Sequence, residues 1–549
     1  MSARAGGDGP GAPGATLSSF LVDAAERFGS REALVCGESR WSYLDLAREA
    51  TRVADGLASL GVSAGDRVGV LLPNWNEFFA TVFGASALGA TVVCLNTMAT
   101  ESELAFHLDH ARVRWLVHAP RFLKHDYEAR LASFGIDGPP GERRAGRDVE
   151  RRVVLVPGGG ELPAGSVDYR AMGRAAADPV AWLRARQGAD PGDPAVVFFT
   201  SGSTALPKAV VHAHRALVHQ AFVASDAFGL GPEDRAWGAL PMFFAGGFVI
   251  IALITLATGG AVVLQDHFEA GRALDLMEAE GISFYAGWQL APALVGHESF
   301  DRRALRLRKG IWTESPAAAR LLAPDHVTVG AYGLSETATV VCLARWDDPP
   351  ELRRRGFGRP LPGVELLVVD PESGTPRAPG DVGEILVRGP SLMLGYLGVP
   401  REECFTSDGF FRTGDYGRLD ETGTLRFDGR LKEVIKTAGV NVAAAEVEAC
   451  LAEVPGLAAA YVVPVPHPVR GENVGAFLVP RGGVVPDPEG VLAHCRREMA
   501  SYKVPRHLFL LPADAVPRTG TQKVDKPLLR RRAAELAGGP ADLLSKSGD

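Results

Sequence analysis

Short β-branched runs alternate with helical patterns along much of this chain, and this alternation limits the fold more than any other feature. Three such runs are Arg67–Leu72, Ala90–Leu95 and Val153–Val156. Strands that alternate with helices build parallel sheets whose crossover helices cover the sheet faces. We therefore predict an α/β fold in which a large N-terminal part consists of layered sheets and helices.

The pattern changes after about Pro360, where short strands and turn signals predict a β-rich subdomain. With 549 residues, the chain is also too long for one ordinary core. A small, mobile α+β domain is expected to follow. The expected strands and helices of these parts lie at Val364–Val369, Gly383–Arg388, Leu425–Phe427, Ala444–Ala452, Ala459–Val463, Gly475–Val479 and Pro488–Met499. The expected division is a tail at residues 1–16, an N-terminal domain at 17–429, a hinge at 430–432, a C-terminal domain at 433–535 and a flexible tail at 536–549.

The stretch Ala236–Gln265 carries no charged residue, and Gly246–Leu264 alone approaches the ~20 apolar residues that cross a bilayer. Pro241 and two Gly-Gly pairs divide this stretch into shorter pieces. Such pieces fit a buried helix at Phe248–Ala257 and a buried strand at Ala261–Leu264. We therefore expect no membrane span.

Composition excludes some functions. The chain has 58 Lys and Arg against 65 Asp and Glu, so 58 − 65 gives a net charge of −7. This balance lacks the basic surface that nucleic-acid binding requires. The six cysteines are far apart and form no CxxC pair, which favours free, mostly buried thiols in a reducing compartment. Met1–Ser18 lacks the apolar core of a signal peptide, so we expect a cytoplasmic protein with no nucleic-acid partner.

The sharpest local signal is the segment that follows Val196–Phe199, where a buried-strand pattern leads into Thr200–Lys208. This segment combines hydroxyl groups, backbone N–H groups and one ammonium, which together can surround a polyphosphate. The spacing is not that of a Walker loop. An ordinary Ser/Gly linker between two strands has a similar composition, so both interpretations stay open on this segment alone.

Lysine is rare in this chain. Only nine of its 58 basic residues are lysines. A slim ammonium approaches a reacting phosphate or carboxylate more easily than the rigid guanidinium of arginine does. The lysines in Gly/Thr-rich contexts, which are therefore candidates for chemistry, are Lys208, Lys432, Lys436 and Lys523. Lys309 and Lys546 are instead expected on the solvated surface.

Two further clusters carry useful chemical groups. In Gly330–Thr337, a strand is expected to end in a glycine turn that presents Tyr332, Ser335 and Glu336. The ring can stack on a base, and the carboxylate can hold Mg²⁺. In Phe411–Asp415, an acidic residue is expected in a tight turn, where it can accept from sugar hydroxyls. Each cluster alone is a weak signal, and a Thr-Gly-Asp triplet is more often an ordinary turn.

Taken in order, these motifs resemble those of the adenylate-forming superfamily, which contains acyl-CoA synthetases, adenylation domains of nonribosomal peptide synthetases and luciferases. The resemblance extends from about Leu17 to Arg531. It rests on Thr200–Lys208, Tyr332–Glu336, Gly383–Gly389 with Gly395-Tyr396, Thr413–Asp415, Gly429–Glu448 and Pro517–Lys523. It implies a reaction in which a carboxylate attacks the α-phosphate of Mg·ATP, after which a thiol, usually that of CoA, displaces AMP.

The resemblance also implies roles for individual residues. The phosphates would contact Thr200, Ser201, Gly202, Ser203, Thr204 and Lys208. Tyr332 would lie at the adenine, Ser335 and Glu336 at phosphate and Mg²⁺, and Asp415 and Arg430 at the ribose. Lys523 would bridge the carboxylate and the α-phosphate, so that Lys523, Lys208 and Glu336 form the catalytic set. Lys432 would be the hinge, and Lys436 and Gly439 would line the thiol tunnel.

The chain departs from the family pattern near the acyl pocket. The residues expected to shape this pocket are Phe243, Phe244, Trp288, Trp312 and Glu314. Phe244 stands where the family commonly has His. Inside the pocket, Glu314 would disfavour a bare fatty chain, because an unpaired buried charge is costly, and would pair with an amine or hydroxyl on an aromatic acid. The alternative places Glu314 at a surface helix cap.

The leading expectation is therefore an ATP-dependent ligase that joins a small or aromatic carboxylic acid to CoA, with ATP, Mg²⁺ and CoA as its small-molecule requirements. One alternative is a diazotase that activates nitrite for attack by an aryl amine. Another is transfer of the acyl group to a carrier protein in trans. A nucleotide-binding regulator without turnover would be expected to lack Lys523 or Glu336, and both are present.

Overall fold

The computed structural model describes most of the chain. The described residues are 15–136, 149–156, 159–186, 188–200, 207–287, 290–311, 316–354, 356–430, 434–437, 440–468, 470–483, 485–499, 503–518, 523–539 and 541–544. Their contacts form two compact units, which are described separately. The first unit holds the described residues up to Glu365 together with Arg388–Phe411, and the second holds Leu366–Val387 and the described residues from Arg412 onward.

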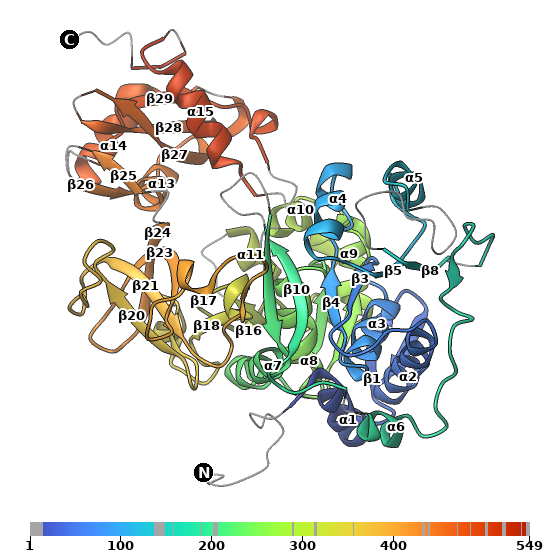
Figure 1. Ribbon diagram of the computed structural model, residues 1–549. Helices are drawn as coiled ribbons and strands as arrows, with labels where there is room; N and C mark the ends of the chain where they lie inside the picture. Colours follow the sequence, from blue (N-terminus) through green and yellow to red (C-terminus); the bar gives the residue numbers. More distant parts are fainter. Residues whose placement is uncertain are drawn as a thin grey trace. The chain divides into compact units, whose positions relative to one another are not determined.

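The first unit contains two large sheets (Figure 1). The eight-stranded sheet has the order β22-β11-β10-β4-β3-β5-β8-β9. Its strands are β3 (Arg67–Leu71), β4 (Thr91–Cys94), β5 (Trp115–His118), β8 (Arg151–Val154), β9 (Val167–Asp168), β10 (Pro194–Thr200), β11 (Lys208–Ala213) and β22 (Gly395–Tyr396). Strands β10, β4, β3, β5, β8 and β9 pair in parallel, as the alternating sequence pattern predicts.

The seven-stranded sheet has the order β16-β15-β14-β12-β13-β1-β2. Its strands are β1 (Glu32–Cys36), β2 (Ser39–Ser42), β12 (Arg235–Gly238), β13 (Ala261–Leu264), β14 (Phe284–Tyr285), β15 (Leu307–Ile311) and β16 (Leu322–Val329). One continuous core joins this sheet to one face of the eight-stranded sheet, with Val92 and Phe198 on one side and Val262 on the other. A second core covers the opposite face of the eight-stranded sheet.

Helices cover these sheets and pack against one another, as α1, α2, α3 and α6 do (Figure 1). The longer helices are α1 (Leu17–Phe28), α2 (Tyr43–Ser59), α3 (Asn76–Ala87), α4 (Glu101–His110), α5 (Tyr127–Ser133), α6 (Pro179–Ala185), α7 (His214–Phe228) and α9 (Ala270–Ala279). Short helices are α8 (Ile254–Leu256), α10 (Ala291–Val295), α11 (Pro316–Leu321) and α12 (Pro350–Arg354). Capping boxes at Thr16 and Ser42 supply acceptors for the free N–H groups at the starts of α1 and α2.

The uncharged stretch lies in the core, as expected. Phe248 and Val262 are fully buried, and the strand expected at Ala261–Leu264 is β13. The expected helix differs in type, because Gly246–Leu253 forms a π-helix before the short α8. Gly247 is required there, since a Cβ atom would lie 2.3 Å from the carbonyl oxygen of Pro241. Among the described helices, none is long and apolar enough to cross a bilayer.

A small three-stranded sheet completes the first unit. It contains β17 (Ala331–Leu334), β18 (Thr339–Leu343) and β19 (Arg359–Pro360), and a separate short hairpin contains β6 (Arg121–Phe122) and β7 (His125–Asp126). Tyr332 therefore lies within a strand, whereas the sequence analysis placed it in a glycine turn.

The second unit contains two smaller sheets. Their strands are β20 (Glu365–Val369), β21 (Gly383–Arg388), β23 (Phe411–Leu419), β24 (Leu425–Arg430), β25 (Val434–Thr437), β26 (Val440–Ala443), β27 (Leu457–His467), β28 (Gly471–Pro480) and β29 (His507–Leu510). Its helices are α13 (Ala444–Ala452), α14 (Pro488–Glu498) and α15 (Lys526–Leu536). Antiparallel strands dominate, so the predicted α/β class with a β-rich part and an α+β C-terminal part is confirmed.

Two details qualify the sequence expectations for this unit. Thr413–Asp415 lies inside β23, so the expected tight turn is wrong. Packing continues past residue 535, because Asp542 is buried and accepts a hydrogen bond from the Leu508 N–H at 3.3 Å. The boundaries expected for the domains and the hinge remain predictions.

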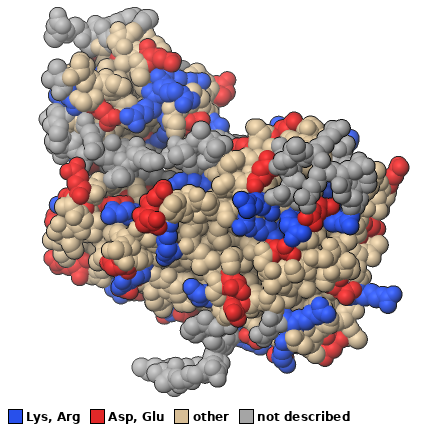
Figure 2. All heavy atoms as spheres, in the orientation of Figure 1, with Lys and Arg blue, Asp and Glu red and all other residues tan. Residues whose placement is uncertain are grey.

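All six cysteines are free, and Cys94, Cys342 and Cys495 are buried while the other three are half-buried. On the face shown in Figure 2, Lys and Arg are interspersed with Asp and Glu. No single sign of charge dominates that face.

Candidate active site

The first part of the site is the end of the β10–β11 hairpin at which β10 stops and β11 starts. Thr200 ends β10 and Lys208 begins β11, and the two residues are paired across the strands. The parallel strands β4 and β3 continue the same sheet, so this end corresponds to the carboxyl ends of β10, β4 and β3. In sheets of this type, ligands bind beyond the carboxyl ends of the parallel strands. The predicted phosphate-binding residues Ser201, Gly202, Ser203 and Thr204 lie outside the described residues.

Tyr396 connects Lys208 to Glu336. The hydroxyl of Tyr396 donates a hydrogen bond to Oε1 of Glu336 at 2.6 Å. The Nζ atom of Lys208 lies 4.4 Å from the centroid of the same ring, within the range of a cation–π interaction. Strand β22 pairs with β11, and this pairing places Tyr396 opposite Val210. One aromatic side chain therefore holds both the cation and the carboxylate.

The backbone that carries Glu336 is fixed from two sides. His212 Nε2 lies 2.7 Å from the Ser335 carbonyl oxygen, and the N–H of Met393 donates to the Glu336 carbonyl oxygen at 2.8 Å. Burial lowers the pKa of His212 to about 4, so the ring is neutral at physiological pH. Because a carbonyl oxygen only accepts, Nε2 must carry the proton of this neutral ring. The short turn Ser335–Thr337 is thus held before any ligand binds.

Strained backbone follows this turn. Ala338 and Thr339 have φ angles of 47° and 85°, in a region that β-branched residues such as threonine rarely adopt. The N–H of Leu334 donates to the Thr337 hydroxyl oxygen at 3.0 Å, and that hydroxyl donates to the Thr339 carbonyl oxygen at 2.6 Å. Gly333 permits the close approach, since a Cβ atom there would lie 1.8 Å from the Thr339 carbonyl oxygen. Strain of this kind clusters at functional sites.

Tyr332, the predicted adenine contact, is 7% exposed and lies on β17 beside Cys342 of β18. Its ring centroid lies 6.4 Å from that of Phe357, in an edge-to-face arrangement. The ring is therefore held by packing. Its contact with adenine remains a prediction.

Asn74 anchors the segment that leads to the predicted acyl pocket. Its side-chain NH₂ group lies 3.0 Å from the carbonyl oxygens of Gly238 and Leu240, and its Oδ1 accepts from the Met242 N–H at 2.9 Å. Phe243 and Phe244 follow, with ring centroids 4.5 Å apart. Phe243 is buried and Phe244 is half-buried. The remaining predicted pocket residues, Trp288, Trp312 and Glu314, lie outside the described residues.

In the second unit, Asp415 of β23 is 2% exposed and pairs with Arg430 of β24 in the strand register. Its N–H donates to the Thr413 hydroxyl oxygen at 3.0 Å, and that hydroxyl donates to the Ile385 carbonyl oxygen at 2.6 Å. Gly414 has a φ of 68° between them. Strand β23, the positive φ of Gly414 and the hydrogen bond to Thr413 orient Asp415, and its contact with a ribose remains a prediction.

Other predicted residues of the second unit are less completely placed. Lys523 is exposed and precedes α15, which begins at Lys526. The backbone of Lys436 lies in β25. Lys432 and Gly439 lie outside the described residues. The convergence of Lys523 and Lys208 on one triphosphate also remains a prediction.

Sequence analysis missed the contributions of Tyr396, His212 and Asn74. Tyr396 was part of a recognised motif, Gly395-Tyr396, but the motif alone did not indicate what its hydroxyl and ring contact. Asn74 follows Pro73 directly after the β3 run, where an Asn in a turn is common. Its four carbonyl and N–H neighbours come from chain segments more than 150 residues away, since the separations are 164, 166, 191 and 168 residues.

Comparison with known proteins identifies the family. The family model described as AMP-binding enzyme matches residues 21–397, and the AMP-binding enzyme C-terminal domain matches residues 446–523. A curated relative, the 3-[(3aS,4S,7aS)-7a-methyl-1,5-dioxo-octahydro-1H-inden-4-yl]propanoyl:CoA ligase of Rhodococcus jostii (strain RHA1), is 33% identical over 533 residues, which cover 94% of this chain and 98% of the relative. The salicylyl-CoA synthase / salicylate adenylyltransferase of a Streptomyces species is 32% identical over 550 residues, covering 96% of this chain and 95% of that protein.

A solved structure also matches nearly the whole chain. The amide bond synthetase McbA from Marinactinospora thermotolerans superimposes with a TM-score of 0.78 and 30% sequence identity, covering 94% of this chain and 99% of that chain. The motif order, the fold and these matches agree. This chain belongs to the AMP-binding enzyme family of the adenylate-forming superfamily, as an AMP-forming, acyl-CoA synthetase-like enzyme.

Proposed function

We propose that this enzyme activates a small aromatic carboxylic acid with ATP and transfers the acyl group to CoA. The observation that carries the proposal is the Lys208–Tyr396–Glu336 cluster at the end of the β10–β11 hairpin. A triphosphate requires a cation at its oxygens and a carboxylate for its Mg²⁺. Both groups are held on one ring there.

In the first step, a carboxylate oxygen of the acid attacks the α-phosphorus of ATP. A P–O bond forms, the bond to the β-phosphate oxygen breaks, and pyrophosphate leaves. Negative charge develops on the pentavalent phosphorus centre, so a cation placed there stabilises the transition state more than the ground state. We assign that role to Lys523 and assign the binding of the β- and γ-phosphates to Lys208.

In our proposal, Mg²⁺ enters with its nucleotide and Glu336 would help to hold it. Among them, no group of three or more His, Cys, Asp or Glu side chains is placed to hold a metal ion. Mg²⁺ is often bound by one or two carboxylates together with substrate phosphates. Glu336 can supply such a carboxylate, and bound Mg²⁺ would neutralise phosphate charge.

In the second step, the thiol of CoA attacks the acyl carbonyl carbon, the C–O bond to AMP breaks, and a thioester forms. Our proposal gives the hinge role to Lys432 and the lining of the thiol tunnel to Lys436 and Gly439. Exchange of the two reaction faces by the C-terminal domain is part of the same proposal. Glycine suits a tunnel wall because it leaves room for the pantetheine arm.

The preference for an aromatic acid draws on the pocket residues and on the relatives. Phe243 and Phe244 offer two packed aromatic rings, and the preceding residue, Met242, donates its N–H to Asn74. One relative is named for salicylate, an aromatic acid with a hydroxyl group. A hydroxyl or amine on the ring would pair with Glu314 if that side chain enters the pocket.

A second candidate for the acceptor comes from a solved structure. The related McbA structure is named for an amide bond synthetase, so an amine acceptor is the second candidate function. The names of the relatives reported above give no support to nitrite activation or to loading of a carrier protein.

A pyrophosphate-release screen tests the function. Carboxylic acids and nitrite are supplied with Mg·ATP, with CoA, with an aryl amine, or with neither, and products are identified by mass. We expect release with aromatic acids and a CoA thioester as the product. Lys208→Ala should raise the KM for ATP, whereas the control Lys124→Ala, at an exposed lysine, should not. An enzyme that never forms AMP with any acid would refute the proposal, and an amide product would favour the second candidate.

A further inference from the structure

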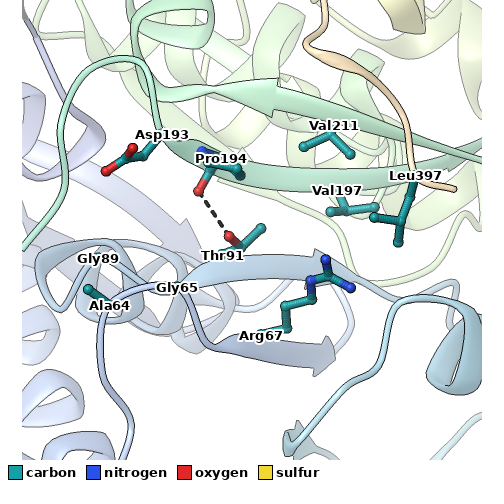
Figure 3. A pocket seen from close by; sticks show the side chains of 10 residues that line it. All are labelled: Ala64, Gly65, Arg67, Gly89, Thr91, Asp193, Pro194, Val197, Val211 and Leu397. Carbon is teal, nitrogen blue, oxygen red and sulfur yellow. Dashed lines mark hydrogen bonds between the residues drawn. The ribbon is translucent and has the colours of Figure 1, made fainter. Parts of the chain in front are cut away.

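A pocket lies on the first unit, away from the hairpin end that carries Thr200 and Lys208. Its volume is ≈ 420 Å³. Arg67, Thr91 and Pro194 are the first residues of β3, β4 and β10 and line it, so it lies at the amino ends of these parallel strands. Figure 3 shows this arrangement. No role assigned above involves this pocket.

Alternation along the strands explains the lining. Side chains two residues apart point to the same face of a sheet. Leu71, Val93 and Phe199 lie in the core on one face of the eight-stranded sheet, and Arg67, Thr91 and Val197 are even numbers of residues away from them on the same strands. Helix α4 covers part of that face and ends at His110. The end of α4 lies next to the pocket, because the lining residues Arg67 and Leu397 contact Ala111 and His110.

Arg67 gives the pocket a positive charge that is only partly compensated. Its Nη1 donates to the Ala111 carbonyl oxygen at 2.8 Å, which uses one of the five N–H groups of a guanidinium. Within the described parts of the chain, no carboxylate forms an ion pair with it. Burial and the neighbouring Arg112 lower the pKa of Arg67, as expected for a crowded cation.

The other polar side chains of the pocket, Thr91 and Asp193, each make a hydrogen bond to the backbone. The Thr91 hydroxyl donates to the Pro194 carbonyl oxygen at 3.0 Å, and the Asp193 carboxylate accepts from the Asp190 N–H at 2.8 Å. In Figure 3, Arg67 rises from the start of β3 towards Val197 and Leu397, whereas Asp193 lies at the opposite end. The cation thus faces apolar side chains rather than the acidic one.

We propose that this pocket binds a small organic carboxylate, whose anionic group pairs with Arg67 and whose apolar body packs against Val197, Val211 and Leu397. A planar guanidinium matches a carboxylate through two parallel hydrogen bonds. The binding site is separate from the catalytic site. Leu397 follows Tyr396 directly, and Tyr396 contacts Glu336 and Lys208. Ligand binding is therefore expected to be measurable in the KM for ATP as well.

The test is ¹⁹F NMR titration of the full chain with 4-fluorobenzoate, with 4-fluorobenzamide as the uncharged probe of the same shape. A non-hydrolysable benzoyl-sulfamoyl adenosine is added to fill the catalytic site, so that the titration measures binding at the Arg67 pocket. We expect saturable binding of 4-fluorobenzoate, and roughly tenfold weaker binding of the amide, because the charge-assisted bonds are lost. Arg67→Gln should weaken carboxylate binding roughly tenfold, whereas Arg112→Gln, at the exposed neighbouring arginine, should change it less than about threefold.

Arg67 also supports the end of α4 through its bond to Ala111, so Arg67→Gln changes local stability as well as charge. Val211→Phe separates the two effects, because it fills the pocket and leaves the charge in place. We expect it to abolish binding without lowering the melting temperature. Equal binding by the wild type, Arg67→Gln and Val211→Phe would overturn the proposal, as would equal binding of the acid and the amide. The Arg67 and Arg112 variants are compared by ligand binding, which does not require catalysis. A negative result for this pocket is therefore distinguishable from a negative result for the proposed function.

Discussion

Lys208 and Lys523 both occur in Gly/Thr-rich segments, yet the structure holds them very differently. Lys208 begins β11, is half-buried, and has its ammonium 4.4 Å from the centre of the Tyr396 ring. Lys523 is exposed and precedes α15 in the second unit. A cation held by a sheet can bind phosphate in the ground state. A cation on an exposed segment suits a role in the transition state alone, where it is needed only after the acid and the α-phosphate have come together.

The largest effect is expected from Lys523→Ala. Loss of a cation that acts only in the transition state should reduce adenylation by about 10²- to 10³-fold, measured by pyrophosphate exchange. Transfer of the acyl group from a preformed adenylate to CoA should continue. Lys526→Ala is the matched control, because Lys526 forms a 3.0 Å ion pair with Glu448 and has no proposed role in chemistry. Normal exchange in Lys523→Ala would contradict the assignment.

Replacement of Tyr396 tests whether Lys208 is positioned before ATP binds. Tyr396→Leu removes both the ring and the hydroxyl, and we expect the KM for Mg·ATP to rise roughly tenfold. Tyr396→Phe keeps the ring beside Lys208 and loses only the bond to Glu336. Its effect should be about threefold and should appear mainly as a higher Mg²⁺ requirement. Identical steady-state parameters for the two variants would mean that the ring does not position Lys208.

His212, which holds the Ser335 carbonyl oxygen in the first unit, is expected to make the free energy of unfolding depend on pH. Its pKa is about 4 in the folded protein, below the usual 6.5, so the unfolded chain binds more protons between these values. Stability should therefore fall as the pH decreases from about 6.5 to about 4. His212→Gln can keep the bond to Ser335 without titrating, and should reduce the loss at pH 5.5 by about 1 kcal/mol. Urea unfolding at pH 7.5 and 5.5 measures this difference, and parallel losses in both proteins would exclude His212 as a cause.

The smallest effect is expected on the choice of acyl substrate, a property in which neither Lys208 nor Lys523 has a proposed role. Glu314→Ala should shift relative kcat/KM from amino- or hydroxy-substituted aryl acids towards unsubstituted ones by a factor of about three to ten. The physical reason is the lost partner for the ring substituent. Competition between paired acids under identical conditions measures the ratio. An unchanged ratio would place Glu314 outside the pocket.

Much of the fold was predictable because its signals are local. The alternating pattern indicated a parallel sheet, and the strand Gly383–Arg388 and helix Ala444–Ala452 occur at the predicted residues. Strand β27 is longer than predicted, spanning Leu457–His467, because its pairing with β28 continues beyond the most strongly β-forming residues. The family was also predictable, since an ordered series of motifs is a property of the sequence itself.

Contacts between distant segments were decided only by the tertiary structure. Lys309 was expected on the solvated surface, and this prediction is wrong, because its Nζ lies 2.8 Å from a carboxylate oxygen of the buried Asp234. The sequence itself determined which residues could bind phosphate, metal or an acid, because chemical type and order along the chain are local facts. Tertiary structure decided that Tyr396 joins Lys208 to Glu336 and that Arg67 faces the apolar side chains of a pocket. The physical reason is that a side chain's partners are set by which strands pair, and strand pairing brings together residues that no local pattern connects.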